Sequence, residues 1–171
     1  MERELLYEGN PQINMVEKYS QMVYRLAFSI MKNKYDADDI HQDVFIRFLK
    51  KQPRFDSEEH ERAWFIRVTV NCCTNYHKTA WRRKTVSLSE YGRQEETEMP
   101  LRQSDAVDLI ETVKRLPEKY RAVIHLFYYE EMSVEEVAKA LHRRTSTVRT
   151  QLVRVRRMLG EWLAEEGRAD G

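Results

Sequence analysis

Very few residues in this chain interrupt a helix. Only five glycines and four prolines are spread over 171 residues. Apolar residues recur through most of the chain at spacings of three and four, which place them on one face of a helix. Sheets with many tight turns need more turn-forming residues than this chain supplies. The pattern therefore predicts an all-α fold.

Three helices are predicted in the front half of the chain. The first covers 15–31 and is followed by a polar break over 33–36. Asp36 or Asp38 can cap the second helix, because a short carboxylate accepts hydrogen bonds from the free N–H groups of a first turn. The second helix ends at Pro53, which cannot continue a helix.

Ser57 is a suitable N-cap for a third, longer helix. Three acids follow it in the first turn, where the helix dipole favours negative charge. The predicted core residues are Val16, Tyr19, Val23, Leu26, Ala27 and Ile30 on the first helix, Ile40, Val44, Phe45, Phe48 and Leu49 on the second, and Ala63, Ile66, Val70 and Cys73 on the third. Together the three helices predict one small helical domain over 1–84.

Residues 85–105 differ in character from both flanks. They include Gly92 and Pro100 and show no sustained periodicity, so they predict a flexible or extended linker. Its acids are expected to keep it off DNA, or to let it mimic nucleic acid inside a channel. These acids are Glu90, Glu95, Glu96 and Glu98.

The rear part, 106–171, is predicted to be a second small helical domain. A short helix over 106–115 stops before Pro117, and proline suits the first turn of the helix predicted over 118–129. That second helix is expected to bury Val123, Ile124 and Phe127.

A capping-box pattern begins the next helix. Ser133 is followed three residues later by Glu136, and the short helix that starts there is separated from the final helix by a break at 142–145. The residues expected to face inward are Val134, Val137, Ala138 and Leu141 on the short helix, and Val148, Leu152, Val155, Leu159 and Leu163 on the final one.

Charge is distributed unevenly along the chain, although the net charge is only +1. Residues 62–84 and 142–157 each carry six basic residues and no acid. Two such stretches, each on a predicted helix, indicate two places where a phosphate backbone is met. The alternative is that both are solvated helix faces balanced by acids elsewhere. The basic residues are Arg62, Arg67, Lys78, Arg82, Arg83 and Lys84 in the first stretch, and Arg143, Arg144, Arg149, Arg154, Arg156 and Arg157 in the second.

A short helix, a tight turn and a longer basic helix form the pattern of a helix-turn-helix. With Val148, Leu152 and Val155 facing the core, other residues of the final helix can reach bases and phosphates: Thr147, Arg149, Thr150, Val153 and Arg154. Arg143 and Arg144 in the turn suit phosphate contacts, which position a protein on DNA without reading sequence. Helical hairpins with a basic outer face also occur in proteins that never touch DNA.

Several motifs resemble the extracytoplasmic-function (ECF) group of RNA polymerase sigma factors. LPEKYRAVI from Leu116, YYEEMSVEEVA from Tyr128 and STVRTQL from Ser146 are similar to region 4 of that family. DADDIHQDVFIR from Asp36 resembles region 2.2, and AWFIRVTVN from Ala63 resembles the tryptophan-bearing helix of regions 2.3 and 2.4. The resemblance covers about residues 14–84 and 106–163, in the family's order. It implies a chain that directs core RNA polymerase to promoters and helps to melt the DNA.

The resemblance also implies where the polymerase binds. The surface that docks on the clamp helices of the polymerase matches Asp38, Asp39, Ile40, Gln42, Asp43, Val44 and Phe45. Acids suit basic side chains of a partner, and neighbouring apolar residues add a contact patch. The alternative is that the apolar members are core residues and the acids are caps, and for Ile40 and Val44 a core role is at least as well supported.

Contacts to the minus-ten element are implied for the third helix. Trp64, Arg67, Asn71 and Asn75 lie along one side of it, where asparagine can bond a base edge and an aromatic ring can stack on an unpaired base. For Trp64 a buried position is the favoured interpretation. Further contacts to DNA are expected from Lys78, Arg82, Arg83 and Lys84, and a loop that can hold a flipped base matches Gln52–Asp56.

Two residues depart from the family's pattern in the turn. The family usually has glycine where this chain has His142 and again where it has Ser146. Glycine tolerates a positive φ, so His142 must adopt that conformation at some cost or the turn must differ. The tilt of the final helix depends on which of these holds.

Other classes of protein are less well supported. The five histidines, His41, His60, His77, His125 and His142, have no partners at triad or metal-ligand spacing, and no glycine-rich phosphate loop is present, so no enzyme activity, metal or cofactor is predicted. The adjacent Cys72 and Cys73 are expected to be reduced helix residues. No apolar run approaches a membrane span, and the acidic N-terminus is unlike a secretory signal, so a cytoplasmic protein is expected.

The expected partners are core RNA polymerase and promoter DNA, and the resemblance adds an anti-sigma factor; no small-molecule substrate and no membrane insertion are expected. A stand-alone helix-turn-helix regulator that binds DNA as a dimer is the alternative, although the sequence contains no heptad zipper for dimerisation.

Overall fold

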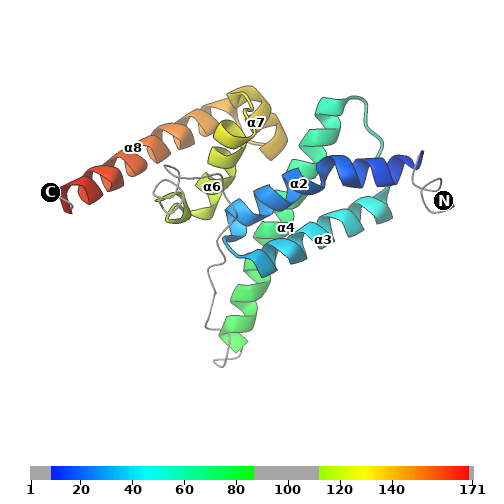
Figure 1. The fold of residues 1–171 in the computed structure, drawn as a ribbon, viewed down its shortest axis with the longest axis horizontal. Coiled ribbons are helices and arrows are strands. Elements are labelled where there is room, and N and C mark those ends of the chain that lie inside the picture. The colour runs from blue at the N-terminus through cyan, green and yellow to red at the C-terminus, as the bar shows by residue number, and fades with distance from the viewer. Residues whose placement is uncertain (1–8, 87–111, 170–171) are drawn as a thin grey trace.

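The described part of the chain is helical throughout its regular elements. The structure, a computed structural model, describes residues 9–86 and 112–169, and within these two ranges it contains no strand. The elements are α2 (Pro11–Met31), α3 (Lys34–Lys51), α4 (Glu58–Val86), α6 (Glu118–Ile124), the π-helix η1 (His125–Tyr129), α7 (Val134–Leu141) and α8 (Thr145–Ala169) (Figure 1). The predicted all-α fold is confirmed.

The front half is built around one aromatic side chain. α2 packs against α3 and α4, and these two also pack against each other. Phe65 of α4 is fully buried where the three helices meet, with its ring stacked on Tyr19 at 4.5 Å between centroids. Phe48 lies 5.2 Å from it and Phe45 5.7 Å.

The cap of α3 differs from the prediction. The Asn33 side-chain oxygen accepts hydrogen bonds from the backbone N–H groups of Tyr35, at 2.8 Å, and Asp36, at 3.3 Å. The helix begins at Lys34, so Asp36 already lies inside its first turn and Asp38 beyond it. The Ser57 cap of α4 is confirmed, because its hydroxyl accepts a hydrogen bond from the His60 N–H at 3.1 Å.

The predicted core face of α4 needs correction. Ile66 and Cys73 are buried, but Ala63 and Val70 are only half-buried. Other residues of α4 are buried instead, because α2 and α3 cover one side of this helix and the rear half covers another. Besides Trp64, which was expected to be buried, the additional buried residues are Phe65, Thr69 and Cys72.

Seven predicted core residues elsewhere are also less buried than expected: Leu49 and Leu163 are exposed, and Val16, Phe127, Val134, Leu141 and Leu159 are half-buried and pack against the core. Leu49 is 46% exposed because it lies on the outer side of α3, and Leu163 is 43% exposed near the C-terminal end of α8. Phe127 is half-buried, and Leu126 and His125 of η1 are buried instead. The wider π-helical turn rotates the chain here, so that a 3.6-residue spacing no longer selects the inner face.

The rear half follows the predicted order of elements. α6 and η1 together cover 118–129, and the capping box of α7 is present: the Ser133 hydroxyl accepts from the Glu136 N–H at 3.1 Å, and the Glu136 carboxylate accepts from the Ser133 N–H at 2.8 Å. Of the short helix predicted over 106–115, residues 112–114 are helical and 106–111 lie outside the described residues. Of the predicted linker, Thr85 and Val86 belong to α4 and the remainder lies outside the described residues.

The two halves are in contact. α2 packs against α6 and η1, and α4 packs against α7 (Figure 1). Helical periodicity predicts two domains but contains no information about how they meet.

A half-buried acid, Glu61, ties α2 to α4 and makes the stability of the front half depend on pH. The Glu61 carboxylate accepts hydrogen bonds from Tyr19 Oη at 2.7 Å and Lys18 Nζ at 2.9 Å. Burial alone would raise the pKa of Glu61, but these two hydrogen bonds outweigh it, so its pKa lies below the ordinary value. A lowered pKa in the folded state adds stability above the unfolded pKa of about 4.3, and this contribution is lost as the pH falls through the folded pKa.

Replacing Glu61 with glutamine should therefore lower stability most near neutral pH. We expect the difference in free energy of unfolding between the natural chain and Glu61→Gln to shrink as the pH falls from about 6 to about 3. Urea unfolding at the two pH values measures this difference. Glu59→Gln, at an exposed neighbouring position, should show little difference at either pH, and a pH-independent effect of Glu61→Gln would contradict the role assigned to its charge.

Candidate nucleic-acid and polymerase interfaces

α7, the turn after it and α8 form the predicted helix-turn-helix. His142 ends α7 with φ +52°, the left-handed conformation that a residue in the place of glycine must adopt. Ser146 lies inside α8 and does not have a positive φ, so its position does not need a glycine. Val148, Leu152 and Val155 are buried beneath α8 as predicted.

The outer side of α8 presents the predicted base-reading residues to solvent. Thr147, Arg149, Thr150 and Arg154 are exposed, and Val153 is 53% exposed although it is apolar. Arg149 is held by an ion pair with Glu135 of α7, at 3.1 Å between Nη2 and Oε1. An exposed valine between arginines matches a surface that meets a thymine methyl beside phosphates.

Of the two arginines predicted to contact phosphate from the turn, one is placed differently. Arg144 is exposed, but Arg143 is half-buried and donates hydrogen bonds to the Lys119 carbonyl at 3.3 Å and Gln151 Oε1 at 3.1 Å. Burial lowers the pKa of Arg143. Its guanidinium therefore braces α8 against α6.

α4 carries the second predicted DNA-contacting surface. Asn71, Asn75 and Lys78 are exposed along one side of it, and Arg67 on the same side is half-buried. Trp64 is only 9% exposed and packs edge-on against Phe65 at 5.0 Å, so the favoured core position is confirmed. The predicted contacts at Arg82, Arg83 and Lys84 fall on the end of α4, where only the backbone is described.

The loop between α3 and α4 lies beside that tryptophan. Gln52 ends α3 with φ +46°, and Phe55 is half-buried, 5.9 Å from the Trp64 ring and 5.4 Å from that of His60. The aromatic ring of the loop thus borders the side of α4 that carries Asn71.

The predicted polymerase surface lies on the outer side of α3. Asp38, Asp39, Gln42 and Asp43 are exposed. Phe45 is 7% exposed and packs against Phe65, so it belongs to the core together with Ile40 and Val44, which have no exposed surface. Phe45 points inward because it follows Ile40 and Val44 on the α2- and α4-facing side of the helix.

Three apolar residues lie on the same outer side: Tyr35 and Ile46 were given no role from the sequence, and Leu49 was wrongly predicted to be a core residue. Tyr35 is 63% exposed, Ile46 41% and Leu49 46%. Tyr35 lies four residues before Asp39, Ile46 three residues after Asp43, and Leu49 three residues after Ile46. Residues three or four apart share one side of a helix, so these apolar residues form one row with the acids. The signal was present, because Ile46 falls opposite the core spacing of Ile40, Val44 and Phe48.

The described residues provide little for other chemistry. Within 9–86 and 112–169 there is no group of three or more His, Cys, Asp or Glu side chains able to hold a metal ion. Cys72 and Cys73 are free and buried, and burial raises the pKa of both thiols. No helix in the described part of the chain is long and apolar enough to cross a membrane.

Each half of the chain matches a model of a known protein family. The Sigma-70 region 2 model matches residues 15–83, and the Sigma-70, region 4 model matches residues 106–159. The RNA polymerase sigma factor SigV of Bacillus subtilis is 26% identical over 159 residues, which cover 90% of this chain and 92% of that protein. The ECF RNA polymerase sigma factor SigW of the same organism is 27% identical over 167 residues, covering 89% of this chain and 88% of SigW.

Solved structures share the fold. The sigma factor RpoE in complex with the anti-sigma factor NepR, from Bartonella quintana, matches with a TM-score of 0.75 at 20% identity, over 87% of this chain and 94% of that one. CnrH in complex with the cytosolic domain of CnrY matches with a TM-score of 0.64 at 22% identity, over 93% of this chain and 92% of that one.

Proposed function

The chain belongs to the ECF sigma factors of the sigma-70 family, and from this premise we propose which of its surfaces meet the polymerase and the promoter. Members of this family direct core RNA polymerase to promoters, and core RNA polymerase and promoter DNA are the partners of this chain. The match of both family models, in order along one chain, is the observation that carries this function. It does not favour a stand-alone regulator, because such a protein has no use for region 2.

The outer side of α3 is the proposed polymerase surface. It consists of Tyr35, Asp38, Asp39, Gln42, Asp43, Ile46 and Leu49. Exposed apolar side chains surrounded by acids support this role, because interfaces bury a few apolar anchors inside a polar rim. The acids would attract a basic partner and align it before contact.

Two further surfaces are proposed to meet DNA. On α4, the proposed contacts to the minus-ten element are Arg67, Asn71, Asn75 and Lys78, and Arg82 and Arg83 would contact the DNA phosphates. Residues 1–84 would form the domain that binds the polymerase and the minus-ten element. Residues 106–171 would bind the minus-thirty-five element through Arg144, Thr147, Arg149, Thr150, Val153 and Arg154, joined to the first domain by 85–105. Melting needs no catalytic group, since preferential binding of unpaired bases shifts the equilibrium toward separated strands.

Membership of this family also suggests a regulatory partner and a cellular location for the chain. RpoE was solved with the anti-sigma factor NepR, and CnrH with the cytosolic domain of CnrY. We therefore propose that an anti-sigma factor also binds this chain. We further propose that it acts in the cytoplasm, where its polymerase works, and that it carries out no bond-breaking chemistry itself.

Arginine replacements on α8 test the assignment of base contacts. We expect Arg149→Ala and Arg154→Ala each to relax the preference for one position of the minus-thirty-five element, with a loss of about 1–3 kcal/mol against the preferred base. In vitro transcription with core polymerase and a randomised promoter library measures this preference.

Arg144→Ala is the matched control for the α8 arginines. As a phosphate contact it should weaken all promoters about equally and leave the preferred sequence unchanged. An even loss over all promoters for Arg149→Ala and Arg154→Ala would contradict their role in reading bases. Tight promoter binding by the chain without polymerase, in a gel shift, would favour the stand-alone regulator.

A further inference from the structure

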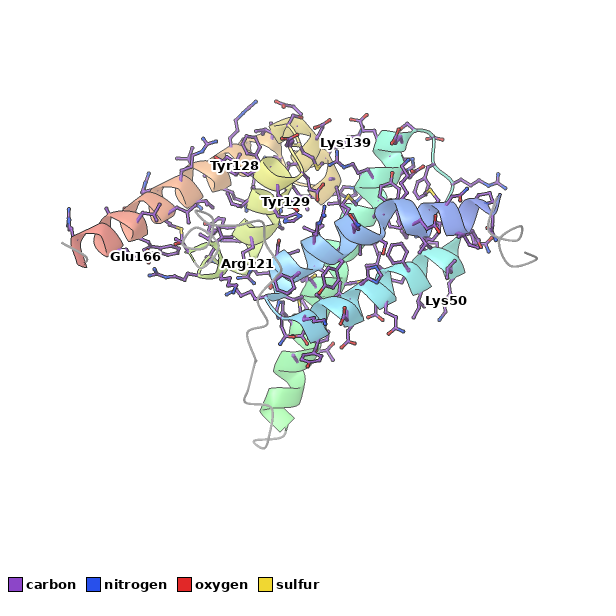
Figure 2. All side chains as sticks on the ribbon, in the orientation of Figure 1. Lys50, Arg121, Tyr128, Tyr129, Lys139 and Glu166 are labelled. Carbon is purple, nitrogen blue, oxygen red and sulfur yellow. The ribbon has the colours of Figure 1, made fainter. Side chains whose placement is uncertain are left out.

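A group of exposed cations at the end of α3 belongs to none of the surfaces proposed above. Residues 44–55 contain four basic residues and no acid. Three of the four lie in the last part of α3, and the fourth follows Pro53 in the loop that leads to α4. All four side chains are exposed, and Lys50 projects from this end of the helix into solvent (Figure 2). This α3 basic cluster consists of Arg47, Lys50, Lys51 and Arg54.

None of the four cations has an acidic partner in the described part of the chain. Their side chains make no ion pair, hydrogen bond or cation–π contact there. The next acid in the sequence, Asp56, instead lies 3.9 Å from His60 Nδ1. On α8, by contrast, the exposed Arg149 lies 3.1 Å from Glu135. Four like charges within eight residues repel one another, so an anion brought to the cluster is attracted by all of them.

Helix stability alone does not account for the cluster. The helix dipole favours cations in the last turn of a helix, which is a sufficient reason for Lys50 and Lys51. It does not apply to Arg54, because α3 ends at Lys51 and Arg54 lies beyond it. Arg47 lies one turn earlier, and its charge acts on α4: burial raises the pKa of the Cys72 thiol, and Arg47 opposes that shift. The two arginines therefore need another explanation.

The charge of the cluster separates it from the proposed polymerase surface on the same helix. That surface carries the exposed acids Asp38, Asp39 and Asp43, so its partner must offer basic groups. Such a partner would repel cations placed beside the acids. The cluster instead suits an anionic partner, and DNA is the anionic partner already proposed for this half of the chain.

The cluster continues the side of α4 that is proposed to bind the minus-ten element. The exposed polar residues of that side, from Lys78 back to Asn71, follow one another toward the start of α4. The loop between α3 and α4 joins that start to the cluster. Arg54 lies in this loop next to Phe55, whose ring is 5.9 Å from that of Trp64. A strand that follows α4 toward its start would therefore reach the cluster next.

We propose that the α3 basic cluster binds phosphates of the separated DNA strand where that strand leaves the minus-ten contacts on α4 and runs toward the transcription start. The end of α4 leads on to the domain proposed for the upstream minus-thirty-five element, so the start of α4 and the cluster face downstream. Cations that follow the backbone beside an aromatic residue are suited to binding a single strand without reading its sequence. The proposal rests on the proposed function, because it needs a strand that α4 already holds.

Binding of single strands by the holoenzyme tests the cluster. The holoenzyme is reconstituted from this chain and core polymerase, and the DNA carries the minus-ten sequence that the promoter library selects. One strand ends at the minus-ten element, and a second extends about six nucleotides further downstream, a length that single-strand-binding surfaces cover. We expect the longer strand to bind more tightly. Combining Lys50→Ala, Lys51→Ala and Arg54→Ala should weaken binding of the longer strand by at least about tenfold at about 0.1 M salt, and leave the shorter strand unaffected.

Salt dependence and uncharged DNA links identify the contact as ionic. For the longer strand, the slope of log K against log salt concentration should flatten by about 2 in the triple variant, because each phosphate contact to a single strand contributes about 0.7. Methylphosphonate links, which carry no charge, in the downstream nucleotides should weaken binding by the natural chain and change binding by the triple variant little.

Lys34→Ala is the matched control, since it removes an exposed lysine from the other end of α3. It should bind both strands like the natural chain, whereas Lys51→Ala alone should lose about fivefold on the longer strand. The triple variant should bind core polymerase with unchanged affinity, which also shows that it is folded.

The outcomes separate the cluster from the proposed function. Equal losses on both strands, or a lower affinity of the triple variant for core polymerase, would overturn the proposal. A triple variant that binds the longer strand like the natural chain would remove the role of the cluster and leave the proposed function standing. A natural holoenzyme that binds neither strand would remove both.

Discussion

Replacing Phe65 with alanine should unfold the front half of the molecule near physiological temperature. The side chain is fully buried and lies within about 6.5 Å, between ring centroids, of five other aromatic rings, so no neighbour can move in to fill the space it leaves. Removing a buried phenylalanine costs about 3–5 kcal/mol, against a total stability of about 5–15 kcal/mol for a small domain. Circular dichroism should record a midpoint lower by roughly 15 °C or more.

Tyr35→Ala is the control for this loss. It removes an aromatic ring from the same half, but that ring is 63% exposed on α3, so the midpoint should move by no more than about 2 °C. Equal shifts for both variants would mean that Phe65 is not the centre of the core.

How far the sequence predicts this molecule depends on whether a feature is local. The capping box at Ser133 and the positive φ at His142 depend on residues within one turn, and both are present. The core face of α4 was misjudged at Ala63 and Val70 because two separate layers cover this helix, and a single apolar stripe cannot describe both. A short π-helix displaced Phe127 for a similar reason, since no spacing rule signals the wider turn.

The site residues divide in the same way. Exposure of Arg149 and Asn71 follows from helical spacing alone, whereas Arg143 satisfies the pattern of a phosphate contact but is used by a carbonyl 24 residues away in the chain. The contact between Arg62 and Glu130 could not be predicted either, because the two residues are 68 positions apart and each resembles an ordinary surface charge. Such pairings depend on how two independently patterned halves meet.

A charge placed in the exposed row on α3 should strongly lower the affinity of the chain for core polymerase. Ile46 is 41% exposed and is not among the residues of the buried core or those packed against it in the described part of the chain. If this row is the polymerase surface, Ile46 is an apolar anchor that becomes buried on binding. Ile46→Asp would then place an unpaired charge in a desolvated contact, and the loss should be at least about 2 kcal/mol, or roughly 30-fold in affinity for core polymerase.

Ile46→Asp should leave the fold intact, because aspartate at an exposed helix position costs little stability. A titration of labelled chain with core polymerase measures the affinity, and thermal unfolding checks the fold. Leu163→Asp is the matched control, since Leu163 is 43% exposed on α8, outside the row; it should bind polymerase like the natural chain. Because both changes add the same charge at the same exposure, a loss confined to Ile46→Asp can only come from what the α3 surface contacts, and equal affinities would remove α3 from the polymerase interface.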